Sequence, residues 1–244
     1  MEVHAHSHTE RKKWTHYLWE FLMLFLAVFC GFFAENIREH KVEHQREKQY
    51  MRSMVEDLRS DTAMLINNIK LRQEKIMMID SLVTLLGSSS VNERGNDIYY
   101  FGRSISPPTN IFPNDGTIQQ LKSSGNLRLI RNDTISNGIM AYDQKMRAVL
   151  FEMGDEVQIR AEYRILARKL FQTKIFHEMI ATDKISIPKN NPALYSKDAG
   201  LVNEFIGALQ YFKRVHQAQL IKSEELLRQA QKLMENIIKE YHLK

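Results

Sequence analysis

The sequence predicts an all-α protein in which one N-terminal transmembrane helix continues into an elongated up-down-up helical bundle or coiled coil with an irregular distal tip. Three observations predict this class. A single strongly apolar run occupies residues 17–34. Neither glycine nor proline follows that run until Gly87. Apolar residues then recur at helical spacing through three long stretches of the chain.

The apolar run has the length of a transmembrane helix when it is extended to cover residues 17–37. At about 1.5 Å per residue this segment spans about 30 Å, which is the thickness of the hydrocarbon core of a bilayer. Trp14, Tyr17 and Trp19 gather at one end of the run. Aromatic side chains in that position mark the membrane interface. We therefore predict a single-pass membrane protein with these three residues at the interface.

Three other interpretations of the apolar run are weaker. A cleaved signal peptide ending at Ala34 would need a small residue where Phe32 stands. A lipoprotein anchor on Cys30 is disfavoured because the bulky Phe29 precedes it. A buried helix of a soluble protein is disfavoured because large apolar residues surround the helix on all sides. Glu20 is the one carboxylate in the run, and we expect it to reach the headgroup region, with a proton relay as the alternative.

Residues 1–16 form a short polar leader that ends in a basic cluster at residues 11–13. Basic residues also follow the span, so a simple positive-inside count points weakly the other way. We favour a cytoplasmic N-terminus because the cluster in the leader is compact and adjoins the span. The later basic residues are instead spread along a helix. This orientation places the rest of the chain outside the cytoplasm.

Three histidines, His4, His6 and His8, alternate in the leader. Neutral imidazoles in such a pattern can bind a divalent metal ion. Without a rigid second shell the expected affinity is weak. The sequence predicts no other cofactor.

Residues 38–50 are expected to form a polar stalk, because glutamates recur at i, i+4 spacing with basic residues between them. The elongated helical domain then covers residues 51–244. Steps of four and three residues give a mainly apolar seam along the first helix, which Gly87 should end. The seam consists of Met51, Val55, Leu58, Thr62, Leu65, Ile69, Arg72, Ile76, Ile79, Val83 and Leu86.

Two more long helices are predicted, from an N-cap at Asn132 or Asp133 to about residue 181 and over residues 198–241. The apolar positions of the second helix are Ile139, Tyr142, Met146, Val149, Met153, Val157, Leu166, Leu170 and Phe171. The seam of the third helix is Val202, Phe205, Leu209, Phe212, His216, Gln219, Ser223, Leu226, Ala230, Leu233 and Ile237. The similar lengths favour up-down-up packing, with an irregular distal tip at residues 87–131 and a membrane-proximal loop at residues 182–197. Because slender rods bury little core, we expect a homo-oligomer.

Two segments resemble a known group of proteins. The tip segment TIQQLKSSGNLRLIRND and the anchor segment WEFLMLFLAVFCGFFAENIREH are similar to an uncharacterised family of single-span membrane proteins from Bacteroidota, which has an N-terminal anchor and an LKSSGNLRLI-type segment. These segments and the start of the stalk cover about a third of the chain. The resemblance implies a location, the inner (cytoplasmic) membrane with the helical domain in the periplasm. It implies no activity and no catalytic residues.

Composition and motifs argue against nucleic-acid binding and catalysis. The net charge is +5, but the 34 basic and 29 acidic residues are interleaved, and no basic stripe with aromatic residues emerges. The chain has no glycine-rich phosphate loop, no Cys-x-x-Cys and no His-Glu-x-x-His motif. We therefore expect no nucleic-acid partner, no catalytic residues and no enzymatic activity.

Four polar residues fall at interior positions of the predicted seams. These are Arg72 in the first helix and His216, Gln219 and Ser223 in the third. Buried polar groups at seam positions often fix register and oligomeric state. Convergent polar groups between helices also form ligand sites. Both interpretations stay open at this point.

The leading hypothesis is a non-catalytic scaffold or interaction protein of the cell envelope that recruits a protein partner through its tip. The contact candidates are Tyr99, Tyr100, Phe101, Ile111 and Phe112, because clustered aromatic residues in irregular segments suit recognition. Closing the end of the bundle is the alternative role for these residues. The second hypothesis is a sensory or ligand-binding module, with a metal ion as one candidate ligand, that signals to a separate membrane partner.

Overall fold

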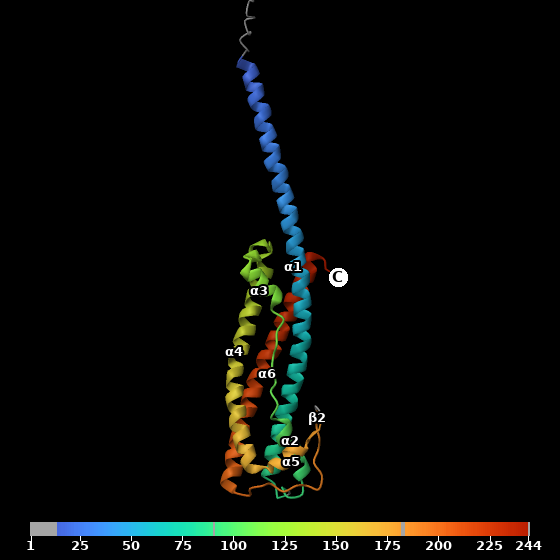
Figure 1. Ribbon diagram of the computed structural model, residues 1–244, viewed down its shortest axis with the longest axis vertical. Coiled ribbons are helices and arrows are strands. Elements are labelled where there is room, and N and C mark those ends of the chain that lie inside the picture. The colour runs from blue at the N-terminus through green and yellow to red at the C-terminus, as the bar shows by residue number, and fades with distance from the viewer. Residues whose placement is uncertain (1–13, 90, 182–183, 244) are drawn as a thin grey trace, which may run out of the picture. The chain divides into compact units, whose positions relative to one another are not determined.

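The computed structural model describes residues 14–89, 91–181 and 184–243, and most of these residues are helical. Its elements in chain order are α1 (Trp14–Leu86), α2 (Gly95–Ser104), α3 (Gly116–Ser123), the 3-10 helix η1 (Asn126–Leu129), α4 (Asp133–Leu170), α5 (Thr173–Glu178), β1 (Ile180–Ala181), β2 (Lys184–Ile185) and α6 (Ala199–Tyr241) (Figure 1). The two short strands pair in antiparallel fashion, with Ile180 opposite Ile185. The predicted all-α class is confirmed.

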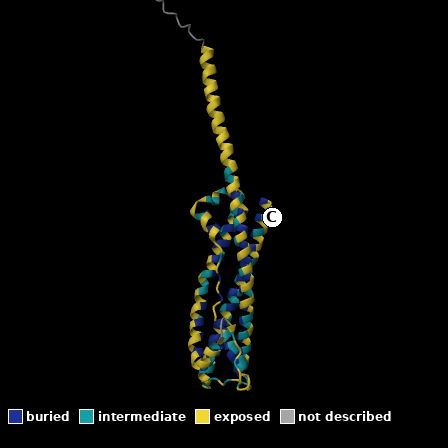
Figure 2. Ribbon diagram, turned by 45° about the vertical axis from the view of Figure 1, so that its right-hand side comes forward, coloured by how far each residue is buried: buried dark blue, intermediate teal, exposed yellow. Residues whose placement is uncertain are grey.

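The chain divides into two compact units, Met1–Gln49 and Tyr50–Lys244. The boundary falls within α1, one residue before the expected start of the helical domain. Within the first unit, α1 contains the one helical segment of the described residues that is long and apolar enough to cross a membrane. Its large apolar residues are exposed, and the helix is accordingly coloured as exposed in Figure 2. An exposed apolar surface of this length suits lipid as its surroundings.

The exposed apolar helix carries two ordered side-chain arrangements. Phe21, Phe25, Phe29 and Phe33 stack at i, i+4 spacing, with 6.2 to 6.4 Å between successive ring centroids. Oε1 of Glu20, the carboxylate of the run, lies 2.9 Å from Nε2 of His16, one turn earlier. Trp14, Tyr17 and Trp19, the predicted interface residues, are exposed in the first turns of the same helix.

In the second unit, α1 (from Tyr50 onward), α4 and α6 share two clusters of buried apolar side chains. Figure 2 shows buried positions along each of these helices. The first cluster includes Met51, Leu58 and Leu65 of α1, Ile139, Met146 and Val149 of α4, and Leu226, Leu233 and Ile237 of α6. The second cluster includes Ile79, Leu82 and Leu86 of α1, Tyr163, Leu166 and Leu170 of α4, and Phe205, Leu209 and Phe212 of α6. Burial of these side chains, at roughly 25 cal/mol per Å2, is the main stabilising term of the unit.

The membership of the two clusters gives the direction of each helix. The early part of α1 in the second unit packs with the early part of α4, and the late parts of both helices pack together. The helix α6 runs the other way, because its late residues join the first cluster. Thus α1 and α4 are parallel and α6 is antiparallel to both. This corrects the expected alternation, in which the second long helix returns along the first.

The reason for the parallel arrangement is an extended connection, residues 105–115, which we call the strap. The strap follows α2 and leads to α3, running lengthwise along the second unit (Figure 1). Eleven residues at about 3.3 Å per residue reach about 36 Å, enough to return to the start of the first cluster. Pro107, Pro108 and Pro113 suit an extended path because proline fixes φ and donates no backbone hydrogen bond.

The strap divides the region that was expected to form a single tip at residues 87–131. Helix α2 lies with residues 191–193 of the loop that was expected at the other end of the domain. Asn96 and Asn191 exchange backbone-to-side-chain hydrogen bonds at 3.2 and 3.0 Å. A Cβ atom at Gly95 would lie 2.3 Å from the carbonyl oxygen of Pro192, so only glycine fits there. The helix α3 instead packs beside the start of α4, in the first cluster.

The ends of the long helices follow local chemistry. Asn132 caps α4 as expected, because its side chain accepts hydrogen bonds from the backbone nitrogens of Thr134 and Ile135. Asp198 likewise caps α6. However, α4 ends at Leu170, eleven residues before the expected end. There the backbone becomes extended at Phe171, and the chain continues into α5 and the short strands.

Candidate functional site

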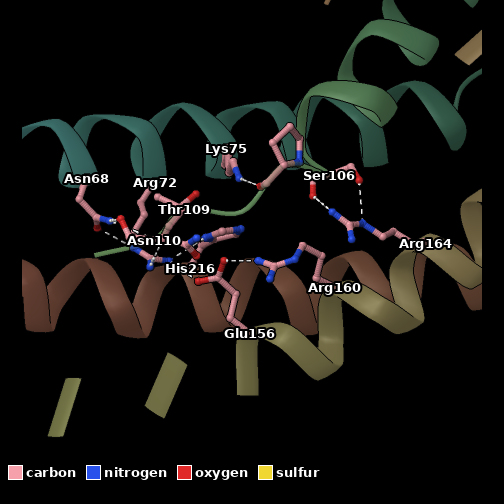
Figure 3. A network of polar contacts seen from close by, with 11 residues as sticks. Asn68, Arg72, Lys75, Ser106, Thr109, Asn110, Glu156, Arg160, Arg164 and His216 are labelled. Carbon is pink, nitrogen blue, oxygen red and sulfur yellow. Dashed lines mark hydrogen bonds and ion pairs between the residues drawn. The ribbon is translucent and has the colours of Figure 1, made fainter. Parts of the chain in front are cut away.

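A layer of polar side chains lies between the two apolar clusters along the second unit. We call it the polar layer. Figure 3 shows most of its members from close by. Its members are Asn68, Arg72 and Lys75 of α1, Glu156 and Arg160 of α4, and His216, Gln219 and Ser223 of α6. All eight side chains are buried, and each long helix contributes at least two. Burial of so many polar groups is favourable only where they satisfy one another.

Arg72 is the centre of the polar layer. Its Nε donates to Oδ1 of Asn68 at 2.9 Å, and its Nη1 donates to Oε2 of Glu156 at 2.9 Å. Nη1 also lies 3.1 Å from Nδ1 of His216, and Nη2 donates to the carbonyl oxygen of Thr109 in the strap at 3.0 Å. One fully buried guanidinium therefore contacts α4, α6 and the strap.

Glu156 is the counter-charge of the layer. Its second oxygen, Oε1, accepts from Nη1 of Arg160 at 3.0 Å. The carboxylate is 1% exposed and lies between two arginines. A buried ion pair of this kind gains little net stability, but losing one partner leaves an uncompensated charge.

His216 is held in one tautomer by its neighbour. Because a guanidinium can only donate, Nδ1 of His216 must accept from Arg72, which leaves the proton on Nε2. That Nε2 is buried and has no hydrogen-bond partner among the described residues, and the same holds for Oε1 of Gln219. Burial, followed by the charges of Lys75, Arg72 and Arg160, lowers the pKa of His216 to about 2. The imidazole is therefore neutral at physiological pH.

The strap is held by side chains along one stripe of α1, and the stripe has two halves. In the donor half, Asn68, Arg72 and Lys75 donate to strap carbonyl oxygens. Nδ2 of Asn68 donates to Asn110 at 3.3 Å, and Nζ of Lys75 donates to Pro107. The spacing i, i+4, i+7 puts all three donors on one helix face. Burial lowers the pKa of Lys75 to about 8.

The acceptor half of the stripe binds backbone N–H groups in and just after the strap. Asp57 accepts from Thr117 at 3.1 Å, Asp61 accepts from Asn114 at 2.8 Å, and the sulfur of Met64 accepts from Phe112 at 3.2 Å. The other oxygen of Asp61 accepts from the hydroxyl of Tyr142 in α4 at 2.6 Å. The helix α3 begins at Gly116, so the nitrogen that Asp57 binds belongs to its first turn.

A second polar feature is a pocket of about 390 Å3 near the end of α4, which we call the arginine pocket. Its lining residues are Gly102, Arg103, Ser106, Tyr163, Arg164, Ala167, Arg168, Thr173 and Phe176. Arg164 donates from Nε to the hydroxyl of Ser106 at 3.1 Å and from Nη2 to the carbonyl oxygen of Ser106 at 2.9 Å (Figure 3). The guanidinium of Arg103 lies 5.8 Å from the ring centroid of Phe176.

The structure separates the five predicted partner-contact residues. Tyr99 is fully buried, stacks edge-on against Phe171, and donates from its hydroxyl to the carbonyl oxygen of Ala193. Ile111 is buried in the first cluster. Neither side chain has surface to offer a partner, so both assignments are corrected: these residues close the core. Tyr100 and Phe101 are half-buried on α2, and Phe112 is 77% exposed on the strap.

The remaining predicted site residues are the polar seam residues and the leader histidines. All four polar seam residues, Arg72, His216, Gln219 and Ser223, are brought together in one layer. His4, His6 and His8 lie outside the described residues, so a metal site there stays a prediction. Sequence reasoning missed Asn68, Lys75, Glu156 and Arg160. The buried pair Glu156 and Arg160 has one signal in the sequence, a charged pair at i, i+4 within an otherwise apolar helix face.

No family model, curated protein or solved structure matches the chain. The resemblance of the anchor and of the LKSSGNLRLI segment to a membrane-protein family therefore stays an expectation.

Proposed function

We propose that this protein is a membrane-anchored, non-catalytic helical scaffold or interaction protein of the cell envelope. The observation that carries the proposal is the contact pattern of Arg72, which joins α1 to α4, α6 and the strap. Glu156 and His216 are the groups of the polar layer best suited to acid and base chemistry. Both are at most 1% exposed, and both contact the guanidinium of Arg72. Catalytic groups must reach a substrate. These groups instead hold chain segments in register, a role known for buried polar residues.

The proposed location is the inner (cytoplasmic) membrane, crossed once by the apolar part of α1, with the N-terminus in the cytoplasm and the helical domain in the periplasm. The exposed apolar surface of α1 supports insertion into a membrane. Orientation is tested in a Cys30→Ala background, since Cys30 is the only cysteine. A cysteine placed at exposed Asn137 of α4 should react with a membrane-impermeant maleimide in intact cells whose outer membrane has been permeabilised. Labelling only after lysis would reverse the proposed orientation.

We propose further that the helical domain is a bundle that forms homo-oligomers. Phe151 of α4 is 86% exposed, and Tyr211 and Ile221 of α6 are also largely exposed. Large apolar side chains outside a core are the residues that self-association covers. Light scattering of the full chain in detergent should give a mass above one copy, and Phe151→Ser should lower it.

Partner recruitment is proposed for the exposed aromatic residue of the strap, Phe112. The strap is fixed by α1 along its length, so Phe112 is presented at low entropic cost. A photo-crosslinking residue in place of Phe112, compared with the same residue in place of Phe151, tests this in native membranes. The Phe112 position should give an adduct with one envelope protein that the Phe151 position does not give. Identical adducts from the two positions would contradict the proposal.

A ligand-binding module is the second candidate function, and the arginine pocket is the observation that favours it. Arg164 at the pocket and Arg160 of the polar layer are one turn apart on α4. Binding in the pocket therefore lies one helical turn from the groups that hold the long helices together. A metal ion on the leader histidines remains the other proposed ligand.

A further inference from the structure

The arginine pocket concentrates positive charge without a matching acid. Arg103, Arg164 and Arg168 line it, and among the described residues no carboxylate forms an ion pair with any of the three. Glu156, the buried carboxylate of α4, already binds Arg72 and Arg160. Like charges held together repel, so an anion that enters such a site is stabilised by all of them.

The charges of neighbouring arginines affect one another in this pocket, as expected for guanidinium groups that lie close together. Burial is the first cause that lowers the pKa of the Arg164 guanidinium, and the charges of Arg160 and Arg103 lower it further. The hydroxyl of Tyr163 donates to the carbonyl oxygen of Gly102. Burial raises the pKa of this hydroxyl, and the nearby charges of Arg103 and Arg164 oppose that rise. Two elements therefore carry the cations of the pocket: α2 carries Arg103, and α4 carries Arg164 and Arg168.

Two residues that line the pocket, Arg103 and Ser106, carry hydrogen-bond donors without an acceptor among the described residues. Nε of Arg103 is buried and has no partner among the described residues. The hydroxyl of Ser106 accepts from Arg164, which leaves its own hydrogen available to donate. Arg164 is fixed to Ser106 by two hydrogen bonds, so its guanidinium is oriented before any ligand arrives. Pre-oriented, partly desolvated donors bind oxyanions more strongly than mobile surface lysines do.

We propose that the arginine pocket is a binding site for a phosphate group carried by a small molecule. Phosphate is the anion class favoured here because it offers several acceptor oxygens to three guanidiniums and a hydroxyl. The volume of about 390 Å3 exceeds a bare phosphate and leaves room for an organic part beside Thr173 and Phe176. The site is separate from the proposed partner contact at Phe112, and the proposal does not rest on the scaffold function.

The test is calorimetric titration of the full chain, in a phosphate-free neutral detergent, with inorganic pyrophosphate as the probe. Arg168→Gln is the decisive variant, because Arg168 is exposed and its loss should leave the fold intact. Arg214→Gln is the matched control, since Arg214 is an exposed arginine of α6 away from the pocket. We expect saturable binding that weakens about tenfold in Arg168→Gln, by the loss of one charge-assisted contact. Arg214→Gln should bind as the native chain does.

Two outcomes overturn the proposal: no saturable binding of pyrophosphate, or equal weakening in the Arg168 and Arg214 variants. Arg103→Gln should abolish binding, and circular dichroism of that variant distinguishes lost binding from lost folding. A competition arm separates the sources of the phosphate group. Glycerol phosphate that displaces pyrophosphate indicates a soluble phosphate ester, whereas displacement only by vesicles containing phosphatidic acid, and not by phosphatidylcholine vesicles, indicates a lipid headgroup.

Discussion

The two halves of the α1 stripe hold the same strap by opposite chemistry. The donor half, Asn68, Arg72 and Lys75, binds carbonyl oxygens and is buried throughout. The acceptor half, Asp57, Asp61 and Met64, binds backbone N–H groups, and two of its three side chains are only half-buried. Side chains on a single face of α1 thus bind carbonyl oxygens at one end of the strap and backbone N–H groups at the other end.

The two halves of the stripe differ in how much each should contribute to the free energy of unfolding. In the acceptor half, each aspartate binds at most two groups, and water can replace part of what Asp57 loses. In the donor half, Arg72 is shared among four partners in a buried layer. Removing a partner costs more where solvent cannot compensate. Substitutions in the donor half should therefore destabilise more than substitutions in the acceptor half.

The largest expected effect is that of Arg72→Met. The substitution leaves Glu156 with one arginine and Nδ1 of His216 without its donor. The carbonyl oxygen of Thr109 keeps only the longer hydrogen bond from Nδ2 of Asn68, at 3.5 Å. We expect a loss of about 3 to 5 kcal/mol in the free energy of unfolding, measured by urea denaturation of the full chain in detergent. Adding Glu156→Leu should restore part of the loss, because it removes the unpaired charge. A loss below about 1 kcal/mol would contradict the central place given to Arg72.

The strongest test of the acceptor half is Asp61→Ala. This change removes the acceptor for the buried hydroxyl of Tyr142 and for the backbone nitrogen of Asn114. We expect a loss of about 2 kcal/mol in the same denaturation experiment, within the range for buried groups left unsatisfied. In a double-mutant cycle with Tyr142→Phe, the two losses should not add. Strict additivity would show that the hydrogen bond at 2.6 Å contributes nothing.

A pH series sharpens the account of the donor half through His216. Its pKa is about 2 in the folded protein and about 6.5 when unfolded. Below pH 6.5 the unfolded chain therefore binds a proton that the folded chain rejects, and stability falls as the pH falls. Between pH 6.5 and 5 this group should remove about 1.5 kcal/mol. His216→Gln should lack that part of the slope, and an unchanged slope would mean that His216 takes up a proton in the folded state.

The smallest expected effect is that of Asp57→Ala. Its carboxylate is half-buried and accepts one hydrogen bond, from the backbone nitrogen of Thr117. We expect a loss of about 1 kcal/mol, together with faster hydrogen exchange at the start of α3. The comparison between the halves breaks down if Asp57→Ala costs as much as Arg72→Met.

Sequence periodicity predicted α6 closely and α1 less well, for a physical reason. In α6, every predicted seam residue except Val202 is buried. The polar residues of this seam were predicted correctly because the apolar residues on either side of them keep a regular helical spacing. In α1, the predicted seam took Ile69 and Ile76, whereas the buried neighbours are Asn68 and Lys75. A rule that prefers apolar residues cannot find polar ones that are buried because they bind the strap.

The same preference explains the missing half of the site. The seam predicted for α4 took Val157, which is 55% exposed, instead of the buried Glu156. Helical periodicity also could not predict the direction of α4 relative to α1, because that direction depends on the course of the strap. The three prolines of the strap indicated an irregular segment, but the side chains of α1 that bind the strap lie 32 to 53 residues away in sequence. Local patterns carry no signal for such pairs.

The parallel course of α1 and α4 has a consequence for how the protein folds. Helical proteins usually fold fast because most of their contacts join near neighbours in the chain. Here Arg72 meets Glu156 and His216 across sequence separations of 84 and 144 residues. The strap must cross the length of the unit before α4 can dock. The entropic cost of closing this loop therefore precedes the stabilising contacts of the polar layer. We therefore expect refolding at a rate more typical of proteins rich in β-sheet, with Arg72 closing the structure in the final step.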